Sequence, residues 1–259
     1  MAEVPLTGQL GNEFQISPEI LALDLDDTLY RTSEAFAAVS ALAAREGICT
    51  QDILDNARVA KEQNGDTFDL DAFLGELGVP QEEVKGLYDR FGAEQDPARF
   101  LYPDALDLIQ AIQQGYRSAY ILTRGTIERQ TAKLLSAGLY NFPHVITDKL
   151  IKSELLRDAK DKHGIYAIEA RVGIDGLILQ ARGGTLVEDR PKGLLGLDGA
   201  QWNGILVQRG RPEELREAQR GAPPEGSIGL RSLRAITERI RSGSLVGDMV
   251  RERLGIQAL

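Results

Sequence analysis

Apolar runs alternate with amphipathic segments along most of the chain. Short apolar runs that end in polar or charged residues are typical of buried strands, and they begin with the run at Ile20. Between them apolar residues recur at helical spacing, with Pro or Gly where a helix would begin or end. This alternation predicts an α/β fold with a doubly wound parallel sheet. After the first run, the predicted strands are 117–123, 144–147, 184–189 and 204–208, and the predicted helices are 103–115, 127–137 and 153–162.

Residues 31–102 have a different character. Ala, Leu, Glu, Asp and Gln recur there at helical spacing, which predicts helices at 34–45, 50–63 and 81–91, with breaks at Gly47, Gly65, Gly78 and Pro80. The stretch carries seven Lys and Arg against fourteen Asp and Glu. We therefore expect an acidic, all-helical domain inserted into an α/β core of residues 1–30 and 103–210.

Two later stretches have weaker patterns. Residues 165–182 fit either one helix or a broken connection, because Gly173 and Gly176 interrupt an otherwise helical spacing. Residues 211–259 include a linker-like segment at 221–226 and an apolar periodic segment at 230–240. They are expected to form a C-terminal helical extension, which is a candidate contact for a homodimer.

Composition excludes several classes of protein. With 42% hydrophobic and 27% charged residues the chain is of the globular type, and its net charge of -9 disfavours a nucleic-acid partner. A single cysteine, Cys49, cannot form an intrachain disulfide, and two histidines leave no Cys/His zinc set. No secretory leader or bilayer-spanning run is evident in the sequence, which predicts a cytoplasmic protein without a membrane partner.

Polar residues stand at the ends of four predicted strands. In an open α/β sheet the ligand site lies beyond the carboxyl ends of the strands, so these side chains are expected to meet there. Carboxylates placed next to a buried strand repel one another unless a cation or a substrate compensates them. The candidates are Asp24, Asp26, Asp27, Thr123, Arg124, Asp148, Lys149, Lys152, Glu188 and Asp189.

The order of these residues resembles the four motifs of the haloacid dehalogenase (HAD) superfamily. Asp24-Leu-Asp-Asp-Thr28 resembles the first motif, and Thr123 at the end of Tyr-Ile-Leu-Thr resembles the second. Lys152, just before a predicted helix, resembles the third, with Lys149 as a rival, and Glu188-Asp189 resembles the fourth. The resemblance covers roughly residues 20–210 and implies a Rossmann-like core with a helical cap.

The resemblance also implies roles for the residues. Asp24 would attack phosphorus and form an aspartyl-phosphate, and Asp26 would act as general acid and then as general base. Thr123 and Arg124 would bind the phosphoryl oxygens, and Lys152 would neutralise Asp24 and the transferring group. A Mg²⁺ ion would be held by Asp24, Asp26 and Asp189.

The fourth motif departs from the family pattern. The family usually has another Asp four or five residues further on, whereas the next acid here is Asp198, so Glu188 and Asp198 are alternative ligands. The expected function is a Mg²⁺-dependent phosphomonoester hydrolase acting on a small phosphorylated metabolite. A phosphomutase and a catalytically weak binding or regulatory protein are the alternatives. A dehalogenase is disfavoured because Asp26 suits an alkoxide leaving group.

Overall fold

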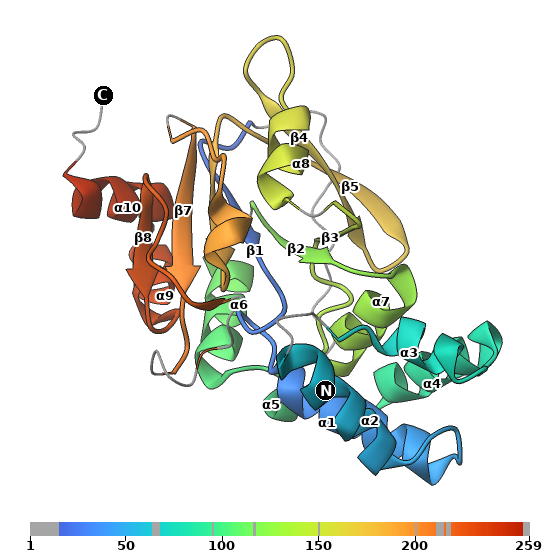
Figure 1. Ribbon diagram of the computed structural model, residues 1–259. Helices are drawn as coiled ribbons and strands as arrows, with labels where there is room; N and C mark the ends of the chain where they lie inside the picture. The colour runs from blue at the N-terminus through green and yellow to red at the C-terminus, as the bar shows by residue number, and fades with distance from the viewer. Residues whose placement is uncertain are drawn as a thin grey trace.

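The described part of the chain forms one eight-stranded sheet in the order β5-β4-β3-β2-β1-β6-β7-β8 (Figure 1). The computed structural model describes residues 16–63, 68–94, 96–115, 118–149, 151–199, 201–210, 215 and 219–255. Six neighbouring strands, from β3 to β8, are parallel, and β4 and β5 add an antiparallel edge. The predicted α/β class is confirmed. The strands are β1 Ile20–Leu23, β2 Ala119–Arg124, β3 His144–Thr147, β4 Tyr166–Val172, β5 Asp175–Ala181, β6 Gly184–Glu188, β7 Trp202–Val207 and β8 Ser227–Leu230.

Both faces of the central strands β1, β2, β6 and β7 are buried, which explains why they read as continuous apolar runs, whereas the edge strand β5 is largely exposed. Successive side chains of a strand point to opposite faces, so Leu21 and Leu23 join one hydrophobic core while Ile20 and Ala22 join the other. Helices α6 Pro103–Gly115, α7 Ile127–Ser136, α9 Arg234–Arg241 and α10 Val246–Leu254 contribute to the first core. Helix α8 Lys152–Asp158 and the short 3₁₀ helix η1 Pro191–Leu194 contribute to the second.

The stretch between β1 and β2 is helical, as its pattern predicts. It contains α1 Thr32–Arg45, α2 Gln51–Gln63, α3 Leu70–Glu76, α4 Gln81–Ala93 and α5 Pro97–Phe100, and then leads into α6. Asp69 caps α3 by accepting hydrogen bonds from the first backbone N–H groups of the helix. Figure 1 shows α1 to α4 grouped beyond the carboxyl ends of the strands.

Two backbone segments join the helical insertion to the core, and they pair with each other. The Arg31 N–H donates to Phe100 O at 2.8 Å, and the Tyr102 N–H donates to Leu29 O at 3.0 Å. Tyr30 is fully buried and forms an isolated antiparallel bridge with Leu101. The insertion is therefore attached at one paired junction, next to the loop that follows β1.

Residues 165–182 form a β-hairpin, so the helix and the broken connection expected there are both wrong. Tyr166–Val172 pairs antiparallel with Asp175–Ala181. The two-residue turn Gly173-Ile174 has a positive φ at Gly173, a conformation that glycine adopts without a Cβ clash and that suits a tight hairpin turn. Alternating burial along β4 distinguishes it from a helix, and the helical spacing was coincidental.

The C-terminal region is not a purely helical extension. Ser227–Leu230 forms β8, which pairs parallel with β7, and α9 and α10 then pack on the core. The expectation erred because the sequence 221–226 resembles a linker, whereas it leads directly into this short edge strand. Residues 1–15, Gly65, Arg117, 211–214, 216–218 and 256–259, which the predicted ranges include, lie outside the described residues. Among the described helices, none has the length and apolar character needed to cross a bilayer.

Glu19 fastens the C-terminal helix to the start of β1. Its buried carboxylate accepts hydrogen bonds from the backbone N–H groups of Val246 at 2.8 Å and Gly247 at 2.7 Å, and from the Thr185 hydroxyl at 2.5 Å. A carboxylate at a helix N-terminus satisfies N–H groups that have no partner within the helix.

We predict that Glu19→Ala lowers the free energy of unfolding by about 2 to 4 kcal/mol, because it leaves two buried N–H groups and a hydroxyl without their acceptor. Urea denaturation measures the effect. Glu225→Ala, at an exposed turn position, is the control and should change stability by less than about 0.5 kcal/mol. Equal stabilities of the two variants would show that Glu19 does not hold α10.

Candidate active site

A tight loop directly follows β1 and carries the first motif. The N–H groups of Leu29 and Tyr30 both donate to Leu25 O, at 3.0 and 2.9 Å, which closes the loop. Asp27 lies within it at φ 58°, a left-handed conformation that Asp tolerates better than most residues. Asp24 is thereby fixed at the carboxyl end of β1, where its N–H donates to Val187 O at 2.9 Å.

Both oxygens of the Asp24 carboxylate are held. The Thr28 hydroxyl donates to Asp24 Oδ2 at 3.1 Å, and Lys152 Nζ donates to Asp24 Oδ1. Lys152 Nζ also donates to Glu188 Oε2 at 2.8 Å. Asp24, Lys152 and Glu188 are all buried, so these charges interact with little screening by water.

Three carboxylates meet at this point. Asp24, Glu188 and Asp189 each place an oxygen within 4.8 Å of the others. Burial raises the pKa of the Asp24 carboxyl to about 7, and Glu188 adds to the rise while Lys152 opposes it. Burial and Glu188 raise the pKa of Asp189 well above its usual range. When all three carboxylates are ionised, the cluster carries more negative charge than its neighbouring cations offset, and this repulsion adds to the effect of burial in raising the pKa of Asp24 and of Asp189.

The turn after β6 lets both adjacent acids enter the cluster. Neighbouring residues of a regular strand point to opposite faces, so the fourth motif predicts only one ligand there. In the structure η1 folds back over the end of β6, and a Cβ added at Gly193 would lie 2.6 Å from Glu188 Cδ. The backbone at Gly193 therefore leaves no room for a larger residue beside Glu188, whose carboxylate is bound by Lys152.

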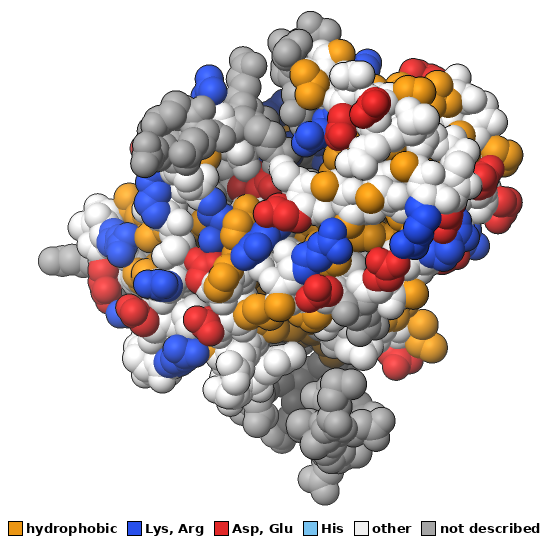
Figure 2. Space-filling model, turned by 90° about the horizontal axis from the view of Figure 1, so that it is seen from below, with side chains coloured by type: hydrophobic (Ala, Val, Ile, Leu, Met, Phe, Trp, Pro, Cys, Tyr) orange, Lys and Arg blue, Asp and Glu red, His pale blue; other side chains and the backbone are white. Residues whose placement is uncertain are grey.

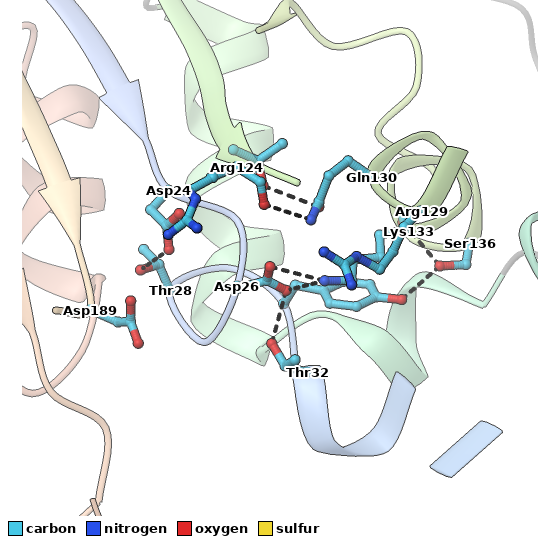
Figure 3. Close-up of polar contacts among 12 residues, drawn as sticks. Asp24, Asp26, Thr28, Thr32, Arg124, Arg129, Gln130, Lys133, Ser136 and Asp189 are labelled. Atoms are coloured by element: carbon cyan, nitrogen blue, oxygen red, sulfur yellow. Dashed lines mark hydrogen bonds and ion pairs between the residues drawn. The ribbon is translucent and has the colours of Figure 1, made fainter. Parts of the chain in front are cut away.

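Asp26 lies outside this cluster. Its carboxylate accepts hydrogen bonds from Lys133 Nζ at 2.6 and 2.9 Å and from the Thr32 hydroxyl at 3.0 Å, as Figure 3 shows. The structure thus does not place the Asp26 side chain in the cluster of Asp24, Glu188 and Asp189, whereas the expected ligand set grouped Asp26 with Asp24 and Asp189. The side chains of Asp24 and Asp26 diverge because they are two residues apart on a chain that has begun to turn.

Lys133 also fixes the charge of Asp26. Burial would raise the pKa of the Asp26 carboxyl, but the ammonium of Lys133 and the hydroxyl of Thr32 outweigh burial and lower the pKa to about 2. In this arrangement Asp26 is ionised at neutral pH. It can orient or accept a proton, but it has none to donate while Lys133 stays in place.

The second motif lies at the end of β2, beside the first. The buried Thr123 hydroxyl donates to Gln130 Oε1 at 3.1 Å, and Gln130 Nε2 donates to Arg124 O at 2.9 Å. Gln130 thereby ties the end of β2 to α7. The Arg124 side chain is exposed.

The alternative lysines and acids lie at different distances from the cluster. Lys152 contacts Asp24, whereas Lys149 is partly exposed and pairs with Asp158 at 2.5 Å. The Asp198 carbonyl accepts a hydrogen bond from the Trp202 N–H at the start of β7, the opposite end of the strand from the site, so Asp198 lies away from the cluster. Among the acids considered for the fourth motif, Glu188 and Asp189 both reach the cluster.

Three further side chains at the site carry no motif signal in the sequence. Lys133 lies on α7, one helical turn beyond Gln130. Arg190 Nε lies 3.8 Å from Asp189 Oδ1, and Gln219 Nε2 donates to Asp189 Oδ2 at 2.7 Å. The adjacency of Arg190 to the fourth motif could have suggested it, but the approach of Lys133 and Gln219 depends on tertiary structure.

The sheet order, the loop after β1 and the helical insertion define a HAD-like fold, and solved structures agree. A haloacid dehalogenase-like hydrolase from Burkholderia xenovorans has a TM-score of 0.55 at 16% identity, with 85% of this chain and 99% of that chain covered. The L-2-haloacid dehalogenase from Xanthobacter autotrophicus has a TM-score of 0.50 at 15% identity, with 86% and 98% covered. No family model and no curated protein matches the sequence. The resemblance inferred from the motifs is confirmed at the level of the fold.

We predict that the Asp26–Lys133 ion pair stabilises the fold in a pH-dependent way. Because the pKa of Asp26 is lowered on folding, its contribution is complete above the unfolded-state pKa and is lost as the pH falls toward about 2. The stability advantage of wild type over Asp26→Asn should shrink by about 1 kcal/mol between about pH 5 and about pH 3.

Urea denaturation of both proteins across this pH range measures the difference. In a Lys133→Met background this loss of advantage at low pH should disappear or reverse, since burial, which raises the pKa of Asp26, is no longer outweighed by the ammonium. An advantage that stays constant with pH in the wild-type background would contradict the lowered pKa.

Proposed function

We propose that the protein is a Mg²⁺-dependent phosphomonoester hydrolase acting on a small phosphorylated metabolite through an aspartyl-phosphate. The observation that carries the proposal is the setting of Asp24. Thr28 and Lys152 hold its two oxygens, and two further carboxylates lie within reach of one cation. This is the arrangement that an anionic nucleophile needs in order to meet an anionic substrate.

The donor set fits Mg²⁺. Asp24, Glu188 and Asp189 offer only carboxylate oxygens, the ligand type that this hard cation prefers, and they converge within 4.8 Å. A bound Mg²⁺ would offset the excess negative charge of the cluster and of the phosphoryl oxygens. The Gln219 amide, which donates to Asp189, would orient that carboxylate toward the ion.

The residues of the chain divide the work between them. An Asp24 oxygen attacks phosphorus, a new O–P bond forms, and the bond from phosphorus to the leaving oxygen breaks. Lys152 balances charge at Asp24 and at the transferring group, and its link to Glu188 fixes the position of the ammonium. Water then cleaves the aspartyl-phosphate and releases phosphate.

Asp26 is proposed to serve the proton transfers, and the structure sets a condition on this role. Its pKa of about 2 belongs to the state in which Lys133 is bound. Donation of a proton to the leaving oxygen therefore requires that substrate binding separate Asp26 from Lys133 or neutralise that cation.

The helical insertion is proposed to act as a cap. Its α3 end contacts the core helix α7, where the Thr126 hydroxyl donates to Asp71 Oδ2 at 2.9 Å and Arg129 pairs with Asp69 at 3.2 Å. Such contacts hold the cap against the core beside the second motif and help to exclude water. Charges of both signs are interspersed on the outer face seen in Figure 2, with no large area of a single sign.

Other reactions on this fold are distinguishable. A phosphomutase would pass the phosphoryl group from Asp24 to a sugar hydroxyl instead of water. A binding or regulatory protein would keep the fold without turnover. The dehalogenase among the similar structures makes halide displacement a further candidate, but a displaced halide needs no proton, whereas Asp26 suits an alkoxide leaving group.

We predict that Asp24→Asn lowers turnover of phosphomonoesters by about 10³-fold or more, because an amide is a far poorer nucleophile than a carboxylate. Phosphate release from a panel of phosphorylated metabolites measures this. The fold should persist, since the substitution removes one of three crowded negative charges, and the exposed Asp148→Asn is the matched control. Substantial residual activity in Asp24→Asn would remove Asp24 as nucleophile, and an inactive wild type across the panel would favour the binding protein.

We predict that Asp189→Asn raises the Mg²⁺ concentration for half-maximal activity by an order of magnitude or more, because the ion loses a charged ligand. Glu188→Gln should raise it less, since Glu188 already pairs with Lys152. Titration of activity with Mg²⁺ compares the two, and Asp198→Asn is the control with a carboxylate outside the site. If only Glu188→Gln raised the Mg²⁺ concentration for half-maximal activity, Glu188 and not Asp189 would be the main ligand. If neither variant raised it, the ion would bind elsewhere.

A further inference from the structure

Arg209 joins the catalytic loop to the junction of cap and core. It follows β7, and its side chain is largely buried, with a relative exposure of 15%. Its Nε and Nη2 both donate to Thr28 O, at 3.1 and 2.9 Å, and its Nη1 donates to Asp104 Oδ2 at 3.1 Å. The guanidinium also stacks on the Tyr102 ring, 3.9 Å from the ring centroid.

Every nitrogen of the guanidinium is thus committed to a protein acceptor. The planar group presents its donors in a fixed fork, and here one edge of the fork is directed at the Thr28 carbonyl and another at the Asp104 carboxylate. Both edges of the guanidinium that present two parallel donors are thus occupied by protein acceptors among the described residues. The role of Arg209 is therefore to position other groups.

The group that Arg209 positions is next to the nucleophile. Thr28, whose carbonyl accepts the two hydrogen bonds from Arg209, donates its own hydroxyl to Asp24 Oδ2 at 3.1 Å. Lys152, at the start of α8, donates to the other oxygen of Asp24. The direction of the attacking carboxylate thus depends on where the backbone at Thr28 lies.

We call the set of contacts that Arg209 makes with Thr28, Tyr102 and Asp104 the Arg209 clamp. Asp104 anchors this clamp to the C-terminal region. Its Oδ2 accepts a hydrogen bond from the Leu233 N–H at 2.8 Å, beside the start of α9, as well as the bond from Arg209. Asp104 stands at the first turn of α6, immediately after the segment that returns from the helical insertion. The clamp accordingly spans the loop after β1, the return segment and the C-terminal helices.

We infer that Arg209 is a positioning residue for the Asp24 nucleophile, acting through the backbone of Thr28. This inference rests on the proposed function for its catalytic consequence. Loss of the clamp lets the loop 25–30 move and misdirects Asp24, without removing any group that binds substrate or metal. The chemical step should suffer while substrate binding does not, because small displacements of a reacting group cost rate.

Arg209→Ala is expected to lower kcat by about 10- to 100-fold and to leave KM within about threefold of wild type. The kcat of Arg209→Lys should lie between those of wild type and Arg209→Ala, since a single ammonium cannot reproduce the planar fork of donors. Guanidinium ion, added below denaturing concentrations, should restore part of the kcat of Arg209→Ala, whereas sodium chloride at equal ionic strength should not. Arg231→Ala is the matched control, because Arg231 binds the Gly210 carbonyl on the same segment at 2.7 Å.

Hydrogen exchange supplies a readout that does not depend on turnover. The amides of Leu29 and Tyr30, which close the loop onto Leu25 O, should exchange faster in Arg209→Ala and not in Arg231→Ala. If Arg209→Ala does not fold, Arg209→Lys is used for both measurements.

Unchanged exchange in the loop would overturn the clamp. Faster exchange with an unchanged kcat, or a loss confined to KM, would overturn its catalytic role. If the wild-type protein hydrolyses no phosphomonoester, the proposed function fails by itself, and the exchange measurement alone decides whether Arg209 holds the loop.

Discussion

The burial of the Asp24 carboxylate at the carboxyl end of β1 is the constraint on which the site depends. A buried carboxylate is costly unless it is paired, and here Lys152 pairs with it from α8 while Thr28 holds its second oxygen. The topology makes this possible, because β1 lies between β2 and β6. The chain leaves β1 toward α1, β2 toward α7 and β6 toward η1, so the carboxyl end of β1 stays open to side chains from neighbouring segments. Lys152 is in turn shared with Glu188, so a single ammonium links the ends of β1 and β6.

The core of this arrangement could be predicted from the sequence because it follows from short-range pattern. Apolar strands that end in Asp24, Thr123 and Glu188 must bring those residues to one edge of a parallel sheet, whatever the loops do. The helical insertion was predictable for the same reason, since its periodicity is local. The hairpin at 165–182 was not, because two short strands separated by Gly-Ile can also be read at helical spacing, and only the pairing partner decides.

The parts of the site that could not be predicted are those set by side-chain reach and direction. Asp26 belongs to the first motif, yet it is turned toward Lys133, and no spacing in the sequence connects residues 107 positions apart. Glu188 and Asp189 both reach the cluster at the end of β6, where the backbone at Gly193 passes closely over Glu188. Arg209 follows directly after β7 and Gln219 precedes the linker-like segment 221–226, and neither position carries a motif. Sequence order therefore indicated which strand ends matter, while tertiary packing determined which atoms meet.

Long-range contacts also connect the C-terminal region with the candidate active site at the carboxyl ends of β1 and β6. Arg209 binds the loop that follows β1, Gln219 binds Asp189, and Glu19 fixes α10 at the other end of β1. Residues that follow β7 therefore contact both ends of β1. Arg209 binds the loop at its carboxyl end, and the start of α10 binds Glu19 at its beginning. A shortened chain ending at β7 would keep every motif of the family and still lose the contacts that orient Asp24 and Asp189. Under the proposed function, the motifs supply the reacting groups, and the segment beyond them supplies contacts that align these groups.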